Sequence, residues 1–293
     1  MFKRKNKQTN IYATIGPWEE MWIRLRKNRL AVVGLIVIVV LIIVAIFADF
    51  VAPFPFAQQD LNNTFAKPSS VHWFGTDNFG RDIFSRVVYG SRVSLRVGLI
   101  SVGIALIVGG ILGALAGYIG GLFDGIVMRI VDIMLAIPSM LLAIAIVSSL
   151  GGGLTNVMIA VGIGSIPQFA RIMRASVLSL KEEQFIEASR ALGLRNHAII
   201  IRHILPNTLA PVIVQSTLGV ASAILSAASL GFLGLGLEPP RPEWGAMLSD
   251  GRPYLRDFPH LTTFPGIAIM ITILALNLLG DGLRDALDPK MKE

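Results

Sequence analysis

The stretch EASRALGLRNHAIIIRHILPN, Glu187–Asn207, is the part of this sequence best suited to recognition chemistry, because it carries both charge signs in a chain that otherwise avoids charge. A narrow apolar stripe with helical i, i+3, i+7 spacing overlaps its start, formed by Phe185, Ala188 and Leu192. Nearby glutamates would meet anionic headgroups on a lipid surface: Glu182, Glu183 and Glu187. These features favour a protein partner, although an ordinary amphipathic surface loop is the simpler alternative.

Sequence motifs for catalysis are absent. No Gly-Lys-Ser or Gly-Lys-Thr occurs, and no lysine follows a glycine, so the sequence contains no phosphate-cradling loop of that type. Neither His-Glu-x-x-His nor Gly-x-Ser-x-Gly is present, which argues against an intramembrane enzyme. We predict a protein that is not an enzyme and that holds no cofactor or metal.

The composition is that of a membrane protein. Of the 293 residues, 53% are hydrophobic and 15% are charged, whereas soluble domains carry about a quarter charged residues. The net charge of +7 fits cationic cytoplasmic loops that meet anionic lipid, and we expect no nucleic-acid binding. There is no cysteine, which excludes disulfides and thiolate metal sites.

Six segments can cross a bilayer, which needs about 20 apolar residues each. Residues 133–170 contain no Asp, Glu, Lys or Arg and are too long for one span, so Gly151-Gly152-Gly153 divides them into a third and a fourth span. The other four spans are predicted at residues 30–52, 97–117, 208–230 and 264–280. The first is too long and too far from the N-terminus for a cleaved signal peptide. We predict an all-α integral membrane protein with six transmembrane helices.

The distribution of lysine and arginine predicts the orientation. With six spans, both termini and the Glu187 loop lie on one side, which carries 18 of these residues, against eight on the other side. The positive-inside rule makes the first side the cytoplasm. We therefore predict a multi-pass protein of the plasma membrane with cytoplasmic N- and C-termini.

The opposite side holds two loops, at residues 53–96 and 238–264. In the first, Asp82 and Arg86 are four residues apart and could stabilise a short surface helix. The second is rich in proline and contains Trp244. Interfacial anchoring by aromatic residues and a docking surface or outer gate are both consistent with these loops.

A first short helix is predicted beneath the membrane, ahead of the fifth span. Ser179 and Glu182 have capping-box spacing, which predicts a helix from about Leu180. Gly193 can adopt the positive φ that ends it, which gives a helix of about thirteen residues, or about 20 Å.

A second short helix is predicted after the glycine. Asn196 can cap a helix from His197 to Leu205, and Pro206 then leads into the fifth span. The segment therefore reads as helix, glycine turn and helix, held by membrane spans on both sides.

These residues resemble a known family. Glu187-Ala188-Ser189, Gly193 six residues after Glu187, and Leu205-Pro206 are similar to the "EAA" loop in the inner-membrane subunits of bacterial ABC importers. The sequence departs from that pattern twice. Ser189 replaces alanine and is small enough to keep close packing, and His203 stands where isoleucine is usual.

The resemblance extends over nearly the whole chain and is closest to the dipeptide/oligopeptide/nickel branch. The motifs that carry it are Thr76-Asp77-Asn78-Phe79-Gly80-Arg81-Asp82, Gly117-Tyr118-Ile119-Gly120-Gly121 with Asp124 and Asp132, and Leu230-Gly231-Phe232-Leu233-Gly234-Leu235-Gly236. The length, the extra first span and its long loop resemble the "C" permease subunit of that branch. The resemblance implies a type I ABC importer (MetI-like) permease fold with an added N-terminal span and a long extracytoplasmic loop.

The resemblance also implies a division of the chain. Residues 1–29 would be a cytoplasmic segment, 30–92 the N-terminal permease extension, 93–283 the permease core with its coupling loop at 179–207, and 284–293 a cytoplasmic tail.

The partners implied are a homologous permease subunit, two cytoplasmic ABC ATPases that bind ATP and Mg²⁺, an extracytoplasmic binding protein and membrane lipid. The cargo would be dipeptides or oligopeptides, and the location the bacterial inner membrane. The residues expected to couple the permease to the ATPases are Glu187, Ala188, Ser189, Gly193, Leu194, Leu205 and Pro206.

A candidate translocation path follows one face of the fifth span. Small and polar residues recur there at intervals of four and three residues, as Gln215, Gly219, Ser222, Ser226 and Ser229. Such a stripe fits a wet pathway or close helix packing, and packing is the commoner role in lipid. A ladder of glycines on the second span, for which we predict packing, consists of Gly109, Gly113, Gly117 and Gly121.

Two further features lie near the cytoplasmic end of the third span and within the third and fourth spans. Arg129 and Asp132 are three residues apart and could form an intramembrane ion pair or a gating contact. Pro138 and Pro167 interrupt their helices, and from the sequence we assign no hinge to either.

Other transport functions remain alternatives. A nickel permease belongs to the same branch, although four histidines and no cysteine offer little to hold a soft cation. A secondary transporter would need acidic residues near mid-bilayer, and the predicted spans three to six contain none.

Overall fold

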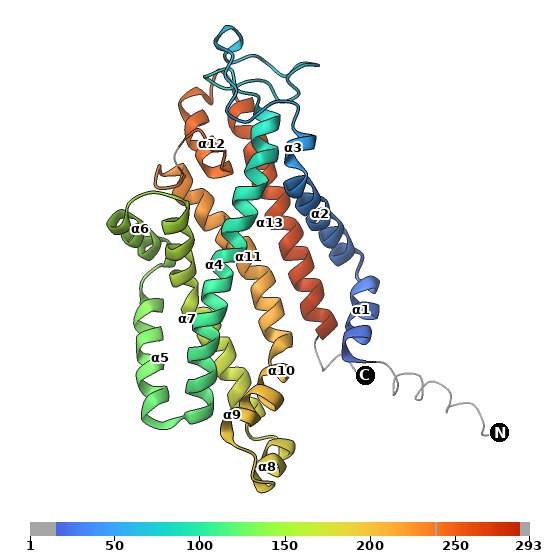
Figure 1. The fold of residues 1–293 in the computed structure, drawn as a ribbon, viewed down its shortest axis with the longest axis vertical. Coiled ribbons are helices and arrows are strands. Elements are labelled where there is room, and N and C mark those ends of the chain that lie inside the picture. The colour runs from blue at the N-terminus through green and yellow to red at the C-terminus, as the bar shows by residue number, and fades with distance from the viewer. Residues whose placement is uncertain (1–15, 238, 288–293) are drawn as a thin grey trace, which may run out of the picture.

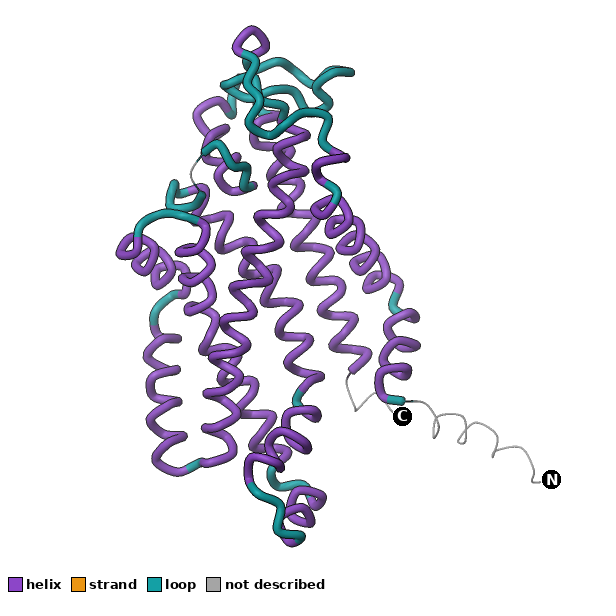
Figure 2. The backbone as a smooth tube through the Cα atoms, in the orientation of Figure 1, coloured by secondary structure: helices purple, strands orange, loops and turns teal. Residues whose placement is uncertain are grey.

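The computed structural model describes residues 16–237 and 239–287, and within these residues the chain is a bundle of helices (Figures 1 and 2). The helices are α1 (Pro17–Lys27), α2 (Arg29–Ile46), α3 (Ala48–Val51), α4 (Ile83–Ile119), α5 (Gly121–Ala136), α6 (Ser139–Leu150), α7 (Leu154–Leu180), α8 (Gln184–Ala191), α9 (Asn196–Ile199), a π-helical segment (Ile200–Ile204), α10 (Leu205–Asn207), α11 (Leu209–Phe232), α12 (Trp244–Gly251) and α13 (His260–Leu287), with short 3₁₀ turns at Leu61–Asn63 and Arg252–Tyr254.

Five of the described helices are long and apolar enough to cross a membrane: α2, α4, α7, α11 and α13. A sixth crossing is available if α5 and α6, which are bent by 90° at their junction, form one broken span. The junction is Ile137–Pro138, so the helix breaks at a proline to which we assigned no hinge. The predicted third span at about 133–150 is wrong in its boundary, because helix already begins at Gly121. Only residues 133–136 of the apolar run belong to that helix, and the run continues through α6 into α7.

One end of the bundle carries α8, the last turn of α13 and α1, and the other carries α12 and residues 53–82 (Figure 1). We refer to these as the α8 end and the α12 end. The Glu187 loop and both chain ends were predicted to lie on the same side. Within the described residues, α8, α1 and the end of α13 lie at the same end of the bundle, in agreement with this prediction. The side of the membrane that each end faces is still a prediction.

The second span is longer than the sequence indicated, because α4 begins at Ile83, not near residue 97. Asp82 caps its first turn by accepting a hydrogen bond from the Ser85 backbone N–H at 2.7 Å. Arg86 does not pair with Asp82, as the i, i+4 spacing suggested, but lies 3.6 Å from Asp77.

Glycine makes possible the close packing of α4 on α7. A Cβ atom at Gly109 would lie 2.6 Å from the Ile166 carbonyl oxygen, and one at Gly113 would overlap the Ala170 carbonyl oxygen. A Cβ atom at Gly117 would lie 2.9 Å from the carbonyl oxygen of Arg174. The predicted packing role is confirmed for these three residues. It is wrong for Gly121, which has φ +59° in the turn into α5 and open space around it.

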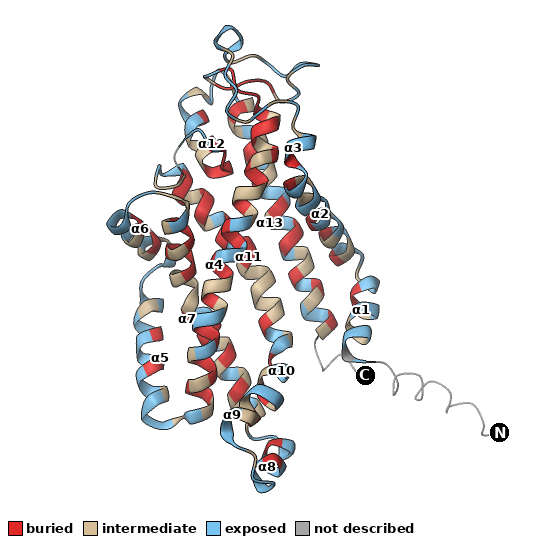
Figure 3. Ribbon diagram, in the orientation of Figure 1, coloured by how far each residue is buried: buried red, intermediate tan, exposed pale blue. Residues whose placement is uncertain are grey.

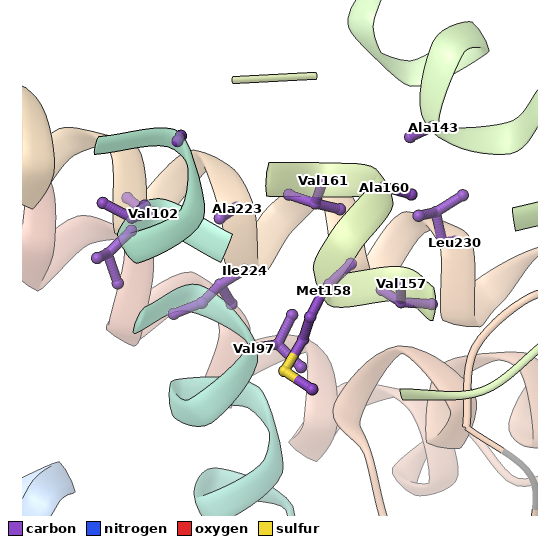
Figure 4. Packing of buried hydrophobic residues seen from close by; sticks show 14 of the residues in the cluster. Val97, Val102, Ala143, Val157, Met158, Ala160, Val161, Ala223, Ile224 and Leu230 are labelled. Atoms are coloured by element: carbon purple, nitrogen blue, oxygen red, sulfur yellow. The ribbon is translucent and has the colours of Figure 1, made fainter. Parts of the chain in front are cut away.

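The main apolar core lies among α4, α7 and α11, where Val97, Met158, Val161, Ile224 and Leu230 are packed together (Figure 4). By contrast, α5 and α6 show mostly exposed surface along one side of the bundle (Figure 3). A cavity lies between this core and the bent pair α5–α6.

At the α12 end, residues 53–82 fold over α4, α12 and the start of α13. Trp244 is 1% exposed and its Nε1–H donates to the Val87 carbonyl oxygen at 3.0 Å, so interfacial anchoring, one of the two alternatives for these loops, is wrong for this residue. Phe74 and Phe264 stack with ring centroids 3.9 Å apart, which ties the loop to α13.

A buried cluster of charged side chains holds residues 53–82, which we call the cover, in place at this end of the bundle. Asp77 accepts a 2.6 Å hydrogen bond from Arg81 Nε and lies close to Arg86, and all three residues are nearly inaccessible to solvent. The Asp250 carboxylate lies 3.8 Å from Arg81. Burial raises the pKa of Asp250, while Arg86 and Arg81 act in the opposite direction.

Replacing Asp77 with asparagine is expected to destabilise the protein by about 3 kcal/mol or more, because two guanidinium groups lose their nearest buried counter-charge. Thermal unfolding of the detergent-purified protein measures the change. Asp257→Asn removes the same charge from an exposed position and serves as the control. Equal stability of the two variants would show that the cluster does not hold the cover.

Candidate functional site

The Glu187 segment lies at the α8 end, between α7 and α11 (Figure 1). Its first helix is shorter than predicted, because α7 continues through Ser179 to Leu180 and α8 spans only Gln184–Ala191. The apolar face of α7 is still packed there, with Val177 fully buried, so the capping-box spacing of Ser179 and Glu182 starts no helix. Glu183 takes the N-cap position without a side-chain cap.

Two side chains anchor α8 to the rest of the fold. Ile186 is completely buried and belongs to a cluster with Ile199 and Ile204, from the second half of the segment. Ser189 is 8% exposed and its Oγ donates to the Phe185 carbonyl oxygen at 2.7 Å. The Ser189 hydroxyl is therefore hydrogen-bonded within α8, and the side chain is small enough for the helix to pack closely.

The opposite face of α8 is exposed. Glu187 and Ala188 lie at the surface, and Phe185 and Leu192 are 42% and 80% exposed. The predicted stripe of Phe185, Ala188 and Leu192 is therefore a free apolar surface with a carboxylate beside it.

The turn after α8 forms as predicted at Gly193, which has φ +80°. The Gly193 N–H donates to the Arg190 carbonyl oxygen at 2.9 Å, and the Leu194 N–H donates to that of Ser189 at 3.2 Å. This pair of bonds is a Schellman motif, which needs a left-handed residue at the position of Gly193. Leu194 packs back against the buried cluster of this segment.

The second half of the segment is helical from Asn196 to Asn207, with a π turn at Ile200–Ile204. Asn196 does not cap this helix, because Arg195 takes the N-cap position, and the Asn196 Oδ1 instead accepts a 2.8 Å hydrogen bond from the Tyr118 hydroxyl at the end of α4. Leu205 is partly buried and Pro206 is exposed in α10. The segment is thus attached to α4 and α7 as well as to α11.

A cavity of about 590 Å³ lies between the α5–α6 bend, α7 and α11. Of the predicted path residues, Ser222 and Ser226 line it. Ser229 instead lines a separate, mainly apolar pocket of about 380 Å³ next to α12 and α13. Gly219 packs near Phe169, and Gln215 is not in the cavity lining. The residues predicted to share one face of the fifth span therefore lie in different environments.

Helix α7 contributes polar side chains to this cavity that were not predicted from the sequence. Gln168 and Arg171 are exposed and three residues apart, and they lie across from Ser139 at the start of α6. Helical spacing places Gln168 and Arg171 on one face, but only the fold shows that this face meets the bend.

The predicted ion pair of Arg129 with Asp132 is wrong. Asp132 accepts a 2.6 Å hydrogen bond from Arg171 Nη2 on α7. The next arginine on the same face, Arg174, donates from Nε and Nη2 to both carboxylate oxygens of Asp124, at 2.5 and 2.6 Å. Two ion pairs therefore join α5 to α7. Partners on different helices cannot be found from i, i+3 spacing.

Comparison with known proteins identifies relatives of the chain. Residues 109–293 match the family model of the binding-protein-dependent transport system inner membrane component, and residues 16–68 match that of the N-terminal TM domain of oligopeptide transport permease C. The dipeptide transport system permease protein DppC of Alkalihalophilus pseudofirmus is 54% identical over 281 residues, which cover 96% of this chain and 92% of the relative.

A second relative carries a different cargo name. The glutathione transport system permease protein GsiD of Escherichia coli O6:K15:H31 is 50% identical over 280 residues, covering 94% of this chain and 91% of the relative. Among solved structures, a chain of the inward-facing MetNI methionine ABC transporter has a TM-score of 0.57 at 20% identity, covering 70% of this chain and 98% of that one. The latter similarity supports the expected MetI-like fold.

Proposed function

Because the chain belongs to the family of binding-protein-dependent transport system inner membrane components, as a C-type permease of an ABC importer, we propose that it forms half of a path for dipeptides or oligopeptides. The observation that carries this proposal is the 54% identity, over nearly the full chain, to a permease named for dipeptide transport. The relative named for glutathione transport makes that compound a second candidate cargo.

The cavity between α5–α6, α7 and α11 supports a polar organic cargo. Its volume of about 590 Å³ lies in the range of small-molecule sites, and serine and glutamine side chains provide hydrogen-bonding groups for a peptide backbone. An exposed guanidinium in its wall suits a peptide better than a free nickel ion, which is the alternative within the same branch.

We further propose that α8 is the coupling helix. ABC ATPases would close around ATP on the cytoplasmic side and push the exposed face of α8, formed by Phe185, Glu187, Ala188 and Leu192. Since Ile186 and Ser189 fix α8 to the ends of its neighbouring helices, a rigid-body shift there would tilt α7 and α11, and both helices line the cavity. The α8 end would then be cytoplasmic, in agreement with its excess of basic residues.

The complete importer would contain this chain, a homologous permease, two ATPases that bind ATP and Mg²⁺, and an extracytoplasmic binding protein. The second permease would supply the rest of the path, in the bacterial inner membrane.

Reconstitution of the complete importer in proteoliposomes tests the cargo. We expect dialanine delivered by the binding protein to raise ATP turnover several-fold and to accumulate inside, whereas Ni²⁺ does neither. Stimulation by Ni²⁺ and not by any short peptide would overturn the peptide assignment. Uptake by this chain alone, driven by an ion gradient, would instead favour a secondary transporter.

A further inference from the structure

Arg171 differs from the other arginine on its face of α7. Arg174 uses Nε and Nη2 to hold Asp124 and is 32% exposed, as expected of a structural ion pair. Arg171 is 56% exposed and makes one hydrogen bond among the described residues, from Nη2 to Asp132. A guanidinium has five N–H donors, so most of those on Arg171 are left for another acceptor.

Arg171 is an exposed charge on a helix that can cross a membrane. It lies on α7, nine residues or about 14 Å before the helix ends at Leu180. An exposed charge on such a helix must face water or a polar cargo, and Arg171 is in the wall of the cavity. Ionisable residues in this situation usually mark a substrate path.

We propose that Arg171 is a specificity-determining residue that binds the free carboxylate of a short peptide in the cavity, an inference that rests on the proposed peptide cargo. Carboxylates and guanidinium groups pair strongly because two parallel N–H···O bonds can form. The neighbouring groups fit the rest of such a molecule. Gln168 lies one helical turn away, and Ser226 on α11 offers a hydroxyl to amide groups.

Asp132 completes the arrangement. Its carboxylate is 52% exposed and accepts the 2.6 Å hydrogen bond from Arg171 Nη2. A peptide that carries both an ammonium and a carboxylate group can contact both residues. The pair would then favour a zwitterionic cargo over a solute with a single charge.

Site-specific thiol labelling can test this inference without the binding protein, because the chain has no cysteine. Ser222→Cys places a nearly isosteric reporter in the cavity wall of the assembled permease–ATPase complex. We expect dialanine to slow its reaction with a methanethiosulfonate reagent at lower concentration than dialanine amide, which lacks the carboxylate. Labelling is followed by the mass of this chain.

In the Ser222→Cys background, Arg171→Gln is expected to raise the half-protecting concentration of dialanine about tenfold or more, the effect of losing a charged hydrogen bond, and not to raise that of the amide. Arg171→Lys should restore part of the preference. Arg129→Gln, on α5 and outside the cavity lining, removes the same charge and should have no effect.

Equal protection by dialanine and its amide in the background variant would overturn the assignment of Arg171, even if Arg171→Gln failed to assemble. So would an unchanged half-protecting concentration in Arg171→Gln, or protection by neither peptide. If dialanine uptake by the unmodified importer were normal in such a case, the proposed peptide function would stand. If no peptide were taken up, the proposed function itself would fail.

Discussion

Replacing Glu187 with lysine is expected to lower ATP-driven peptide uptake by about 100-fold or more while the chain still inserts and assembles with its partner permease. Glu187 is exposed on α8, so the substitution disturbs no buried contact of this chain. A reversed charge at a close protein interface costs several kcal/mol, and tenfold corresponds to about 1.4 kcal/mol. Uptake into proteoliposomes, with ATP turnover measured in parallel, gives the effect.

Glu19→Lys is a suitable control for this prediction. Glu19 is exposed on α1, also at the α8 end, and the substitution makes the same charge change away from α8. We expect it to retain near-normal uptake. Full uptake by the Glu187→Lys importer would contradict the coupling role of that carboxylate.

Replacing Gly113 with leucine should destabilise the chain by more than about 3 kcal/mol and remove most of the folded protein from the membrane. Even the first carbon of a side chain would overlap the Ala170 backbone oxygen, and α4 and α7 would have to separate. Size-exclusion recovery and thermal unfolding in detergent measure the loss. Uptake should fall in proportion to the folded protein.

Gly103→Leu provides the matched control, because it makes the same substitution on the same helix at a position with open space around the glycine. We expect Gly103→Leu to fold with nearly normal stability. If both variants were equally stable, the backbone contact between α4 and α7 would not be needed for folding.

Much of the fold could be predicted because lipid imposes simple rules. Apolar length identified the long spans, and the spacing of Gly109, Gly113 and Gly117 indicated close packing. The bend at Pro138 could not be predicted, since a proline in a membrane helix can be accommodated with or without a large change of direction. The long start of α4 was missed because Arg86, Arg92 and Arg96 interrupt the apolar residues before Val97.

The candidate functional site could also be predicted only in part. The turn at Gly193 depends on local backbone geometry, and so the sequence was sufficient to predict it. The start of α8 was not predictable, because tertiary packing around Val177 overrides the local signal at Ser179. The pairing of Asp132 with Arg171 joins residues 39 positions apart, and only the packing of α5 on α7 brings them together.

Cross-linking from Leu192 tests most directly whether a separate ATPase engages α8. This side chain is 80% exposed at the C-cap of α8, and Leu192→Cys would be the only thiol of the chain. A short heterobifunctional reagent attached to it in the assembled importer should capture an ATPase subunit, while the same reagent at Leu61→Cys, exposed at the α12 end, should not. Capture of the extracytoplasmic binding protein from Leu192→Cys, with no ATPase product, would place α8 outside the cell and contradict its role in coupling.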